Sequence, residues 1–413
     1  MLLEPAGFRL FENPRAARTA PYAAEGRDGI LSLGALAEAK REITAWPGYR
    51  PTPLRRLTGL AAAVGIGDIL YKDEAERFGI GSFKALGGAY AVFRVLQAEI
   101  LRQPGCSVSS LELLSGRHAA LTSRITVTAA TDGNHGRSVA WGARNFGCGC
   151  VIYLPASTSE GRWRAIAAYG AEVRRVPGTY DDAVRRAAAD AAAQGWHVVS
   201  DTAYAGYMDV PRHVMQGYGL MVEEALAQAP AIPTHVLVQA GVGGLAAAVC
   251  ATLWERLGAD RPRYIAVEPA TADCLYRSAV AGRPTPAEGA LDTIMAGLAC
   301  GEVSILAWRI LETGADAFMT VGDTAAAECM RLLALDRAHD GAVVAGESAV
   351  AGLTGLLVAA ADADARRRLA LDRDSTVLVF GTEGATDPVL YRRIVGRAPE
   401  DVAAPAAPAT AGS

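Results

Sequence analysis

Short runs of apolar, β-branched residues alternate with longer alanine-rich runs through the middle of the chain, and this alternation restricts the possible folds most strongly. The predicted strands are Ile125–Ala130, Cys150–Leu154, Glu172–Val176, His197–Ser200, His235–Gln239, Arg263–Val267, Ala317–Val321 and Thr376–Phe380. The predicted helices cover 134–146, 160–169, 180–194, 211–228, 243–257, 323–338 and 346–361. Such alternation is typical of an α/β fold with mainly parallel sheets, and strands that are apolar throughout are covered on both faces.

The length, charge and hydrophobicity of the chain indicate a large globular protein that binds neither nucleic acid nor membranes. The 413 residues, 51% of them hydrophobic, are enough for a large core and roughly two or three domains. The formal net charge of -4 gives no basic surface for nucleic acid, so no nucleic-acid partner is expected. No apolar run is long enough to span a membrane, and the first residues do not form a secretory signal. We therefore expect a cytoplasmic protein without a membrane partner.

The cysteines do not indicate a metal site or a disulfide framework. There are 7, an odd number in a large chain, which favours reduced thiols. Cys148-Gly-Cys150 has the ligands for half of a zinc site, but no second half with suitable spacing follows. No metal is therefore expected.

A lysine at position 84 is unusual because arginines supply almost all of the positive charge. The stretch GSFKALGGAY (81–90) places Lys84 at the predicted start of a helix, among apolar residues and glycines with no acidic neighbour. Burial there would lower the pKa of the amine and make it nucleophilic toward a carbonyl. An ordinary helix lysine that reaches solvent is the alternative. Lys72 lies in a charged Lys-Asp-Glu run and is interpreted as surface charge.

Further loops join predicted strands to helices, where α/β folds bind ligands. The loop VQAGVGGL (238–245) has glycines that let backbone N–H groups converge on an anion, although a tight turn has the same pattern. The loop TDGNHG (131–136) presents Asp132, Asn134 and His135, and the helix cap is its structural alternative. The loop FGTEGAT (380–386) adds hydroxyl groups.

Taken in this order, these loops resemble one family, the fold-type II enzymes that use pyridoxal 5′-phosphate (PLP), the group of threonine dehydratase and tryptophan synthase β. Within it, the resemblance is to the diaminopropionate ammonia-lyases. It covers roughly Phe11 to Arg393, and Asp132 separates this family from ordinary serine and threonine dehydratases. The matching stretches are YKDEAERFGIGSFKALGGAY, TDGNHGRSVAWGAR, YGAEV, DTAYAGY, MQGYG, PTHVLVQAGVGG, VEPATADCLYRS, DTIMAGLACGE, GES and GTEGATD.

The resemblance implies a cofactor and residues that bind it. Lys84 would bind PLP covalently through its amine, and Asn134 would hydrogen-bond the hydroxyl of the cofactor ring. Thr382 would face the ring nitrogen, where a hydroxyl stabilises a protonated ring less than a carboxylate would, which suits elimination. The remaining cofactor-binding residues are expected to be Phe83, Gly241, Val242, Gly243 and Gly244, the last four around the phosphate.

The resemblance also implies an elimination reaction. Asp132 and Asp201 would lie near opposite faces of the substrate and could take the α-proton from either the D or the L isomer of 2,3-diaminopropionate. Loss of the β-amine gives aminoacrylate, which hydrolyses to pyruvate and a second ammonia. The alternatives are β-replacement, deamination of serine or threonine, and an inactive binding protein on the same fold.

Some positions depart from the family. The family usually continues Thr-Ala-Trp-Glu-Gly-Tyr after Asp201, whereas this chain has Thr-Ala-Tyr-Ala-Gly-Tyr, with Tyr204 and Ala205 as the replacements. The stretch 160–164 reads EGRWR where Gln-Glu-Arg-Val is frequent, and Gly244 replaces another small residue. These departures affect the expected substrate more than the cofactor.

The expected architecture has two open, twisted α/β lobes with the cofactor in the cleft between them. The larger lobe would comprise 1–100 and 206–395, the smaller lobe 101–205, and a disordered tail 396–413. The segment 103–124 would be a poorly ordered connection between the two lobes. A homodimer is implied by the resemblance. Cys274 and Cys300 lie in matching stretches and are expected to be free thiols, with a disulfide as the alternative.

Overall fold

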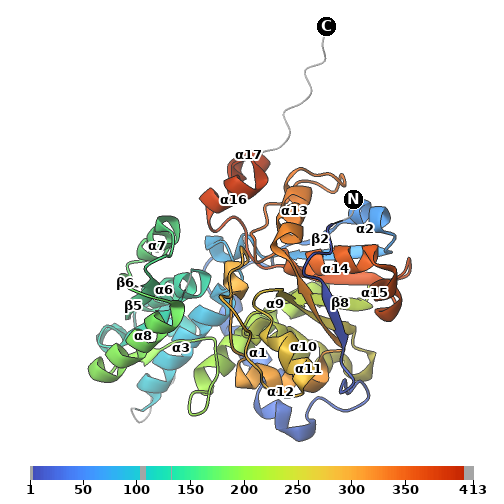
Figure 1. The fold of residues 1–413 in the computed structure, drawn as a ribbon. Helices are drawn as coiled ribbons and strands as arrows, with labels where there is room; N and C mark the ends of the chain where they lie inside the picture. Colours follow the sequence, from blue (N-terminus) through green and yellow to red (C-terminus); the bar gives the residue numbers. More distant parts are fainter. Residues whose placement is uncertain (1–2, 103–107, 132, 404–413) are drawn as a thin grey trace.

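The computed structural model describes residues 3–102, 108–131 and 133–403 and contains two β-sheets. The larger has seven strands in the order β1-β10-β9-β8-β11-β3-β2, and the smaller has four in the order β6-β5-β4-β7. Figure 1 shows the smaller sheet with α6, α7 and α8 beside the larger lobe. The expected α/β fold with two open sheets is confirmed.

Parallel pairing dominates both sheets. The two edge strands of the larger sheet, β1 and β2, are antiparallel to their neighbours, whereas its other pairs and those of the smaller sheet are parallel. The strands of the larger sheet are β1 (Arg9–Glu12), β2 (Leu54–Arg56), β3 (Asp68–Asp73), β8 (His235–Gln239), β9 (Arg263–Pro269), β10 (Ala317–Val321) and β11 (Thr376–Gly381). Those of the smaller sheet are β4 (Thr126–Ala130), β5 (Gly149–Pro155), β6 (Glu172–Val176) and β7 (His197–Val198).

Helices cover both sheets. The longer ones are α1 (Leu33–Thr44), α3 (Ala85–Leu101), α6 (Asn134–Phe146), α8 (Tyr180–Gln194), α9 (Asp209–Gln228), α10 (Gly244–Leu257), α12 (Ile305–Gly314), α13 (Asp323–Ala334) and α14 (Ala351–Ala361). The shorter ones are α2 (Thr58–Val64), α4 (Ser110–Leu114), α5 (Ala119–Thr122), α7 (Glu160–Ala167), α11 (Cys274–Ala281), α15 (Ala363–Arg368), α16 (Pro388–Val395), α17 (Pro399–Ala403) and the 3-10 helices η1 (Ala24–Gly29), η2 (Arg77–Gly79), η3 (Gly258–Asp260) and η4 (Ala296–Leu298). No helix in the described ranges is long and apolar enough to cross a membrane.

Two predictions about irregular segments are corrected. The segment 103–124 is not a loose connection where it is described, because it forms α4 and α5, and Ser109 and Glu112 cap α4 reciprocally. The predicted disordered tail 396–413 contains helix α17, which is held because Val402 is buried against the core of the larger lobe. Residues 103–107 and 404–413 lie outside the described residues.

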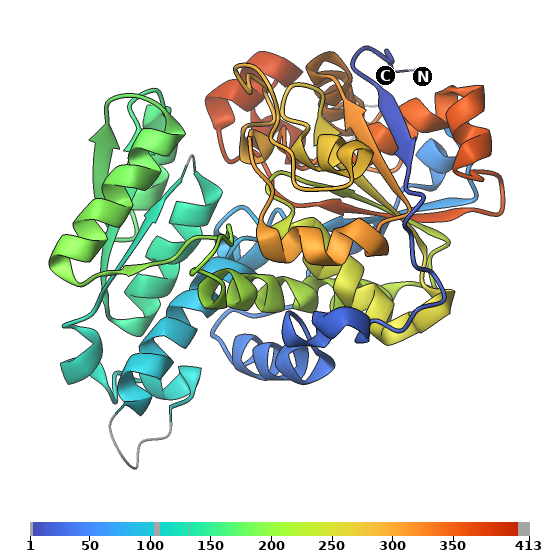
Figure 2. The same ribbon diagram turned by 60° about the horizontal axis from the view of Figure 1, so that its bottom comes forward.

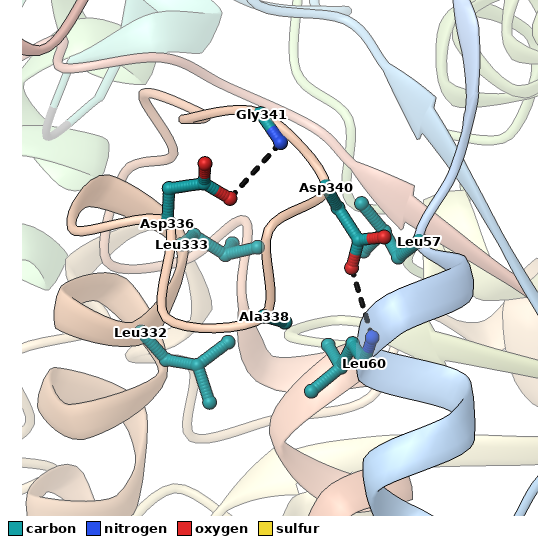
Figure 3. A pocket seen from close by; sticks show the side chains of 8 residues that line it. All are labelled: Leu57, Leu60, Leu332, Leu333, Asp336, Ala338, Asp340 and Gly341. Atoms are coloured by element: carbon teal, nitrogen blue, oxygen red, sulfur yellow. Dashed lines mark hydrogen bonds between the residues drawn. The ribbon is translucent and has the colours of Figure 1, made fainter.

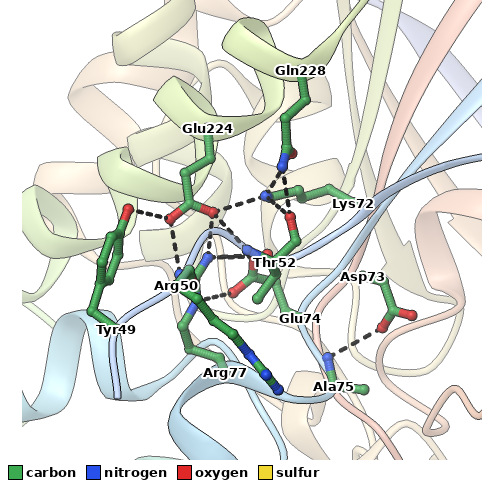
Figure 4. A network of polar contacts seen from close by, with 10 residues as sticks. All are labelled: Tyr49, Arg50, Thr52, Lys72, Asp73, Glu74, Ala75, Arg77, Glu224 and Gln228. Carbon is green, nitrogen blue, oxygen red and sulfur yellow. Dashed lines mark hydrogen bonds and ion pairs between the residues drawn. The ribbon is translucent and has the colours of Figure 1, made fainter. Parts of the chain in front are cut away.

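Lys72 is buried, so its interpretation as surface charge is wrong. Its side chain is 0% exposed, because β3 lies between β2 and β11 and is covered by α9. The Lys72 amine donates to Glu224 of α9 at 2.8 Å and to the Thr52 carbonyl at 2.6 Å. Figure 4 shows that Arg77 donates to the same Glu224 and to Glu74, so two cations and two carboxylates form one buried network.

Glycines allow three helices to pack very closely where the lobes join. A Cβ at Gly217 of α9 would lie 1.8 Å from the Leu86 carbonyl oxygen of α3, and one at Gly88 would lie 1.9 Å from the Ser138 hydroxyl of α6. Helix α3 therefore touches α9 of the larger lobe and α6 of the smaller one. In Figure 2, α3 (cyan) lies between the smaller lobe (green) and the helices of the larger lobe.

Candidate active site

Lys84 and Asp201 form an ion pair where the chain passes between the two sheets. Lys84 immediately precedes α3, Asp201 follows β7, and the amine donates to the carboxylate at 2.7 Å. Both side chains keep about a fifth of their surface exposed, 20% and 19%. The rings of Phe83 and Tyr218 lie 5.4 and 5.7 Å from the amine. The amine is thus enclosed by two rings and one carboxylate.

The two charges stabilise each other. Burial disfavours the ammonium of Lys84, but the charge and hydrogen bond of Asp201 outweigh it and raise the pKa of Lys84 above its usual value. Burial likewise opposes the Asp201 carboxylate, yet Lys84 holds the pKa of Asp201 below its usual range. The predicted lowering of the Lys84 pKa is therefore wrong, because the acid that pairs with it lies 117 residues away in the sequence.

His135 and Tyr218 complete the surroundings of this pair. His135 Nε2 bonds the Val199 carbonyl at 2.8 Å, and Nδ1 lies 3.8 Å from Asp201. Burial lowers the pKa of His135, which favours the neutral ring. Burial raises the pKa of Tyr218 to about 12, so its hydroxyl keeps its proton. Neither residue was among the predicted site residues, although the TDGNHG loop contains His135.

Asn134 reaches across to the larger lobe. Its side-chain amide, at the start of α6, donates to the carboxylate of Glu383, which also accepts from the Ser348 backbone N–H at 3.1 Å. Glu383 was not predicted as a site residue, although it lies in the GTEGATD stretch. The predicted catalytic residue Asp132 lies outside the described residues, and its role stays a prediction.

Phe83 and Thr382 lie on adjacent backbone segments beside Lys84. The Phe83 N–H donates to the Thr382 carbonyl at 3.0 Å, and the Gly384 N–H donates to the Gly81 carbonyl at 3.0 Å. The hydroxyl of Thr382 accepts from Gln239 at 2.7 Å. The sequence-based grouping of these two residues with Lys84 thus corresponds to a direct contact.

The glycine-rich loop opens α10 beside Asp201. Gly243 has φ 96°, a conformation that favours glycine, and Gly244 begins the helix. A Cβ on Gly244 would lie 3.5 Å from the Asp201 carbonyl oxygen, and one on Gly241 would lie 2.8 Å from Cys300 Sγ. The loop therefore places glycine backbone at the N-terminus of a helix, an arrangement that binds anions such as phosphate.

The thiols on the far side of this loop are not joined. Cys274 is a free cysteine, so it forms no disulfide with Cys300, and its Sγ donates to the Gly241 carbonyl at 3.7 Å. Among the described residues there is no His, Cys, Asp and Glu cluster that could hold a metal ion.

Of two small hollows in the structure, one adjoins the predicted site residues and the other does not. One of about 180 Å³ adjoins the site and is lined by Gly133, Asn134, Arg137, Arg162, Ala165, Ile166 and Thr386. The other, of about 200 Å³, lies between α2 and the loop after α13 (Figure 3) and contains no predicted site residue. In that hollow Asp340 accepts from the Gly59 and Leu60 N–H groups and caps α2, so its polar groups have a structural function.

Arg162 connects the lobes at the edge of the first hollow. From α7 it donates to Glu347 of the larger lobe at 2.9 Å and lies 3.7 Å from Asp387. Burial, followed by the neighbouring charge of Glu383, raises the pKa of Glu347 to about 8.

Comparisons with known proteins agree on one family. Residues 45–383 match the family described as "Pyridoxal-phosphate dependent enzyme". The diaminopropionate ammonia-lyase of Escherichia coli (strain K12) is 43% identical over 359 residues, 84% of this chain and 88% of that protein. The Salmonella typhimurium (strain LT2) enzyme is 40% identical over 363 residues, 84% of this chain and 89% of its own.

Solved structures show the same relationship. The holo diaminopropionate ammonia-lyase from Escherichia coli superposes with a TM-score of 0.86 at 38% identity, over 96% of this chain and 97% of that one. The same enzyme in complex with an aminoacrylate-PLP azomethine reaction intermediate gives a TM-score of 0.83 at 38% identity, over 95% and 97% of the two chains.

Proposed function

Because this chain belongs to the family of pyridoxal-phosphate dependent enzymes, and within it to the diaminopropionate ammonia-lyases, we propose that it eliminates ammonia from 2,3-diaminopropionate. The products are pyruvate and two ammonia. The observation that carries the proposal is the 2.7 Å pair of Lys84 and Asp201 beside the glycine loop at the N-terminus of α10. A primary amine, a proton acceptor and an anion site are then grouped at one place.

The residues present fit PLP. When bound, PLP withdraws electrons from the substrate carbon that loses its proton. Lys84 supplies the primary amine that holds the cofactor, and the loop Gly241–Gly244 supplies backbone N–H groups for its phosphate. Asn134, now bonded to Glu383, would turn its amide to the ring hydroxyl, and the Thr382 hydroxyl would face the ring nitrogen.

The carboxylates Asp201 and Asp132, together with the Lys84 amine, are the groups that can transfer protons in this reaction. Elimination needs a base for the α-proton and an acid for the departing amine. Without the cofactor, the Lys84 ammonium holds the pKa of Asp201 below its usual range, so Asp201 is a carboxylate beside the amine. That carboxylate would accept the α-proton on its side of the substrate. Asp132 serves the opposite face. Both carboxylates also attract the second ammonium group of a diamino acid, which serine and threonine lack.

A pyruvate-release assay tests this proposal. The purified enzyme is compared on D- and L-diaminopropionate, serine, threonine and β-substituted alanines. We expect the highest kcat/KM with diaminopropionate, and Asp201→Asn to reduce turnover of one isomer more than that of the other. Highest kcat/KM with a β-substituted alanine plus an added nucleophile would instead favour β-replacement, the second candidate, for which the replaced residues Tyr204 and Ala205 are the supporting observation.

The localisation, oligomeric state and lobe boundaries of the enzyme are proposed as well. We propose a cytoplasmic homodimer whose lobes comprise 1–100 with 206–395 and 101–205. The position of the smaller sheet, from Thr126 to Val198, supports this division. Light scattering of the purified protein is expected to give twice the chain mass of 43.0 kDa.

A further inference from the structure

The hydroxyl of Tyr207 is bonded to the backbone immediately before Asp201. It donates to the Val198 carbonyl at 2.8 Å and accepts from the Ser200 N–H at 3.0 Å. Between these two residues, the Val199 N–H donates to Thr128 at 2.7 Å and its carbonyl bonds His135. The Tyr207 hydroxyl thus holds the backbone of the three residues that precede Asp201, and their conformation determines the position of Asp201.

The turn that follows Asp201 keeps the Tyr207 ring in place. Tyr204 and Tyr207 exchange backbone hydrogen bonds at 3.2 and 2.9 Å, and their rings stack at 5.0 Å with an interplanar angle of 19°. Gly206 has φ 86°, which favours glycine and lets the turn close this tightly. Burial raises the pKa of Tyr207 above its usual value, so the hydroxyl keeps the proton that it donates.

The other side of Asp201 is fixed independently of Tyr207. The Ala203 N–H donates to the Ser304 hydroxyl at 3.0 Å, and the Ile305 N–H donates to the Ala203 carbonyl at 3.1 Å. Asp201 therefore sits between two anchors, one made by the start of α12 and one by the Tyr207 hydroxyl. Loss of the hydroxyl would release only the side on which β7 leads into the site.

We propose that Tyr207 is a positioning residue that aims the Asp201 carboxylate at the reacting proton and so sets the preference for one substrate isomer. The inference rests on the proposed function, in which Asp201 serves one face of the substrate. Displacing a reacting group by about 1 Å can cost about 100-fold in rate. Asp132 belongs to a different stretch of the sequence, TDGNHG (131–136), so the other isomer is expected to depend much less on Tyr207.

Tyr207→Phe tests the inference, because it removes the hydroxyl and keeps the stacked ring. Tyr169→Phe, just after α7 and away from this turn, is the control for loss of a tyrosine hydroxyl, and Asp201→Asn identifies the isomer that depends on Asp201. For each holoenzyme, kcat and KM are measured with D- and L-diaminopropionate. We expect Tyr207→Phe to lower kcat for the Asp201-dependent isomer about 10-fold or more, and to change its KM and the other isomer's kcat less than about 2-fold. Tyr169→Phe is expected to match the wild type.

A second measurement does not depend on turnover. The visible absorbance of each holoenzyme is titrated with pH, because its midpoint reports the charge placed beside the Lys84 amine. The midpoint of Tyr207→Phe is expected to move from the wild-type value toward that of Asp201→Asn. Thermal unfolding should stay within a few degrees of the wild type, because the ring and its stack with Tyr204 are retained.

The outcomes separate the two proposals. Equal loss with both isomers, or an unchanged isomer ratio in Tyr207→Phe while Asp201→Asn alters it, overturns the positioning role. An unchanged ratio in Asp201→Asn contradicts the face-specific part of the proposed function instead. In that case only the pH midpoint of the absorbance tests the positioning role. If the midpoint of Tyr207→Phe equals the wild-type value, the positioning role is overturned as well.

Discussion

Three lysines in an arginine-rich chain occupy three different environments. Lys40 is 53% exposed and 3.5 Å from Glu223, Lys72 is fully buried in an ionic network, and Lys84 is paired with Asp201 between the sheets. Scarcity and apolar neighbours singled out Lys84 as a residue of interest, and its catalytic role stays a prediction. The partners of Lys72 and Lys84 could not be predicted, because Glu224 and Asp201 are 152 and 117 residues away from them.

Lys84→Arg separates charge from chemistry at this position. Arginine keeps a cation for Asp201 but has no primary amine, so it cannot form an imine. We expect a folded protein with activity reduced by at least about 1,000-fold, and no cofactor left attached after borohydride reduction and denaturation. Mass spectrometry of the reduced chain measures the attachment. Cofactor bound covalently to this variant would contradict the assignment of Lys84.

Strands in the interior of the chain were easier to predict than those near its beginning. Every predicted strand is present, with ends that differ by a residue or two, whereas β1, β2 and β3 were not predicted. Strand β3 reads DILYKD, and its charged ends hide a segment that is buried at all six positions. These charges are tolerable because other elements supply partners: α9 pairs with Lys72 through Glu224, and the two arginines of β2 pair with Asp68 and Asp73. Such pairings cannot be identified from the sequence of β3 itself.

The network around β3 can be tested by removing its lysine. Burial lowers the pKa of Lys72, but its amine still bonds Glu224, which would lose a partner in Lys72→Met. Breaking a buried pair typically costs about 3–5 kcal/mol, so we expect a loss of that order in the free energy of unfolding. Lys40→Met is the control and should change the free energy of unfolding by less than about 1 kcal/mol. Urea titrations measure both, and equal effects would contradict the account.

The contact between α3 and α9 depends on glycine. In Gly217→Ala the new methyl group would meet the Leu86 carbonyl only 1.8 Å away, and backbone on both helices must move apart. We expect a loss of about 1–3 kcal/mol or more. Gly161→Ala in α7 is the control, because its nearest neighbour is 3.9 Å away and alanine favours helices. The temperature of the thermal unfolding midpoint should be lowest for Gly217→Ala, intermediate for the wild type and highest for Gly161→Ala. A Gly217→Ala protein as stable as the wild type would contradict this packing.

At the scale of the whole molecule, the two-lobe architecture was predictable but the order of its strands was not. Alternating strands and helices, together with the family resemblance, indicated two α/β lobes. The order β1-β10-β9-β8-β11-β3-β2 joins strands from both ends of the chain, and one sequence contains no local signal for such pairings. The same applies to Arg162 and Glu347, which connect the lobes across 185 residues.

Glu347 makes the stability of the folded chain depend on pH. Its pKa is raised to about 8, above the value of about 4.3 in an unfolded chain, so the folded state holds more protons between these pH values. The contribution of this group to stability therefore falls as pH rises through that window, by at most about 1.4 kcal/mol per pH unit. Glu347→Gln should flatten the fall, measured by unfolding at pH 5 to 8, whereas exposed Glu160→Gln should not. Parallel pH profiles for wild type and Glu347→Gln would contradict this role.

In the described residues the chain leads from β3 of the larger sheet through α3 toward the smaller sheet, and returns from β7 through α9 to β8. Lys84 stands at the start of the first passage and Asp201 at the start of the second. Points near the axis of a rotation move least. If one lobe turns on the other about these passages, atoms far out in α7 or α8 sweep long arcs, whereas the amine of Lys84 and the carboxylate of Asp201 stay almost where they were. The enzyme can therefore open to admit substrate and still keep its two reacting groups in register.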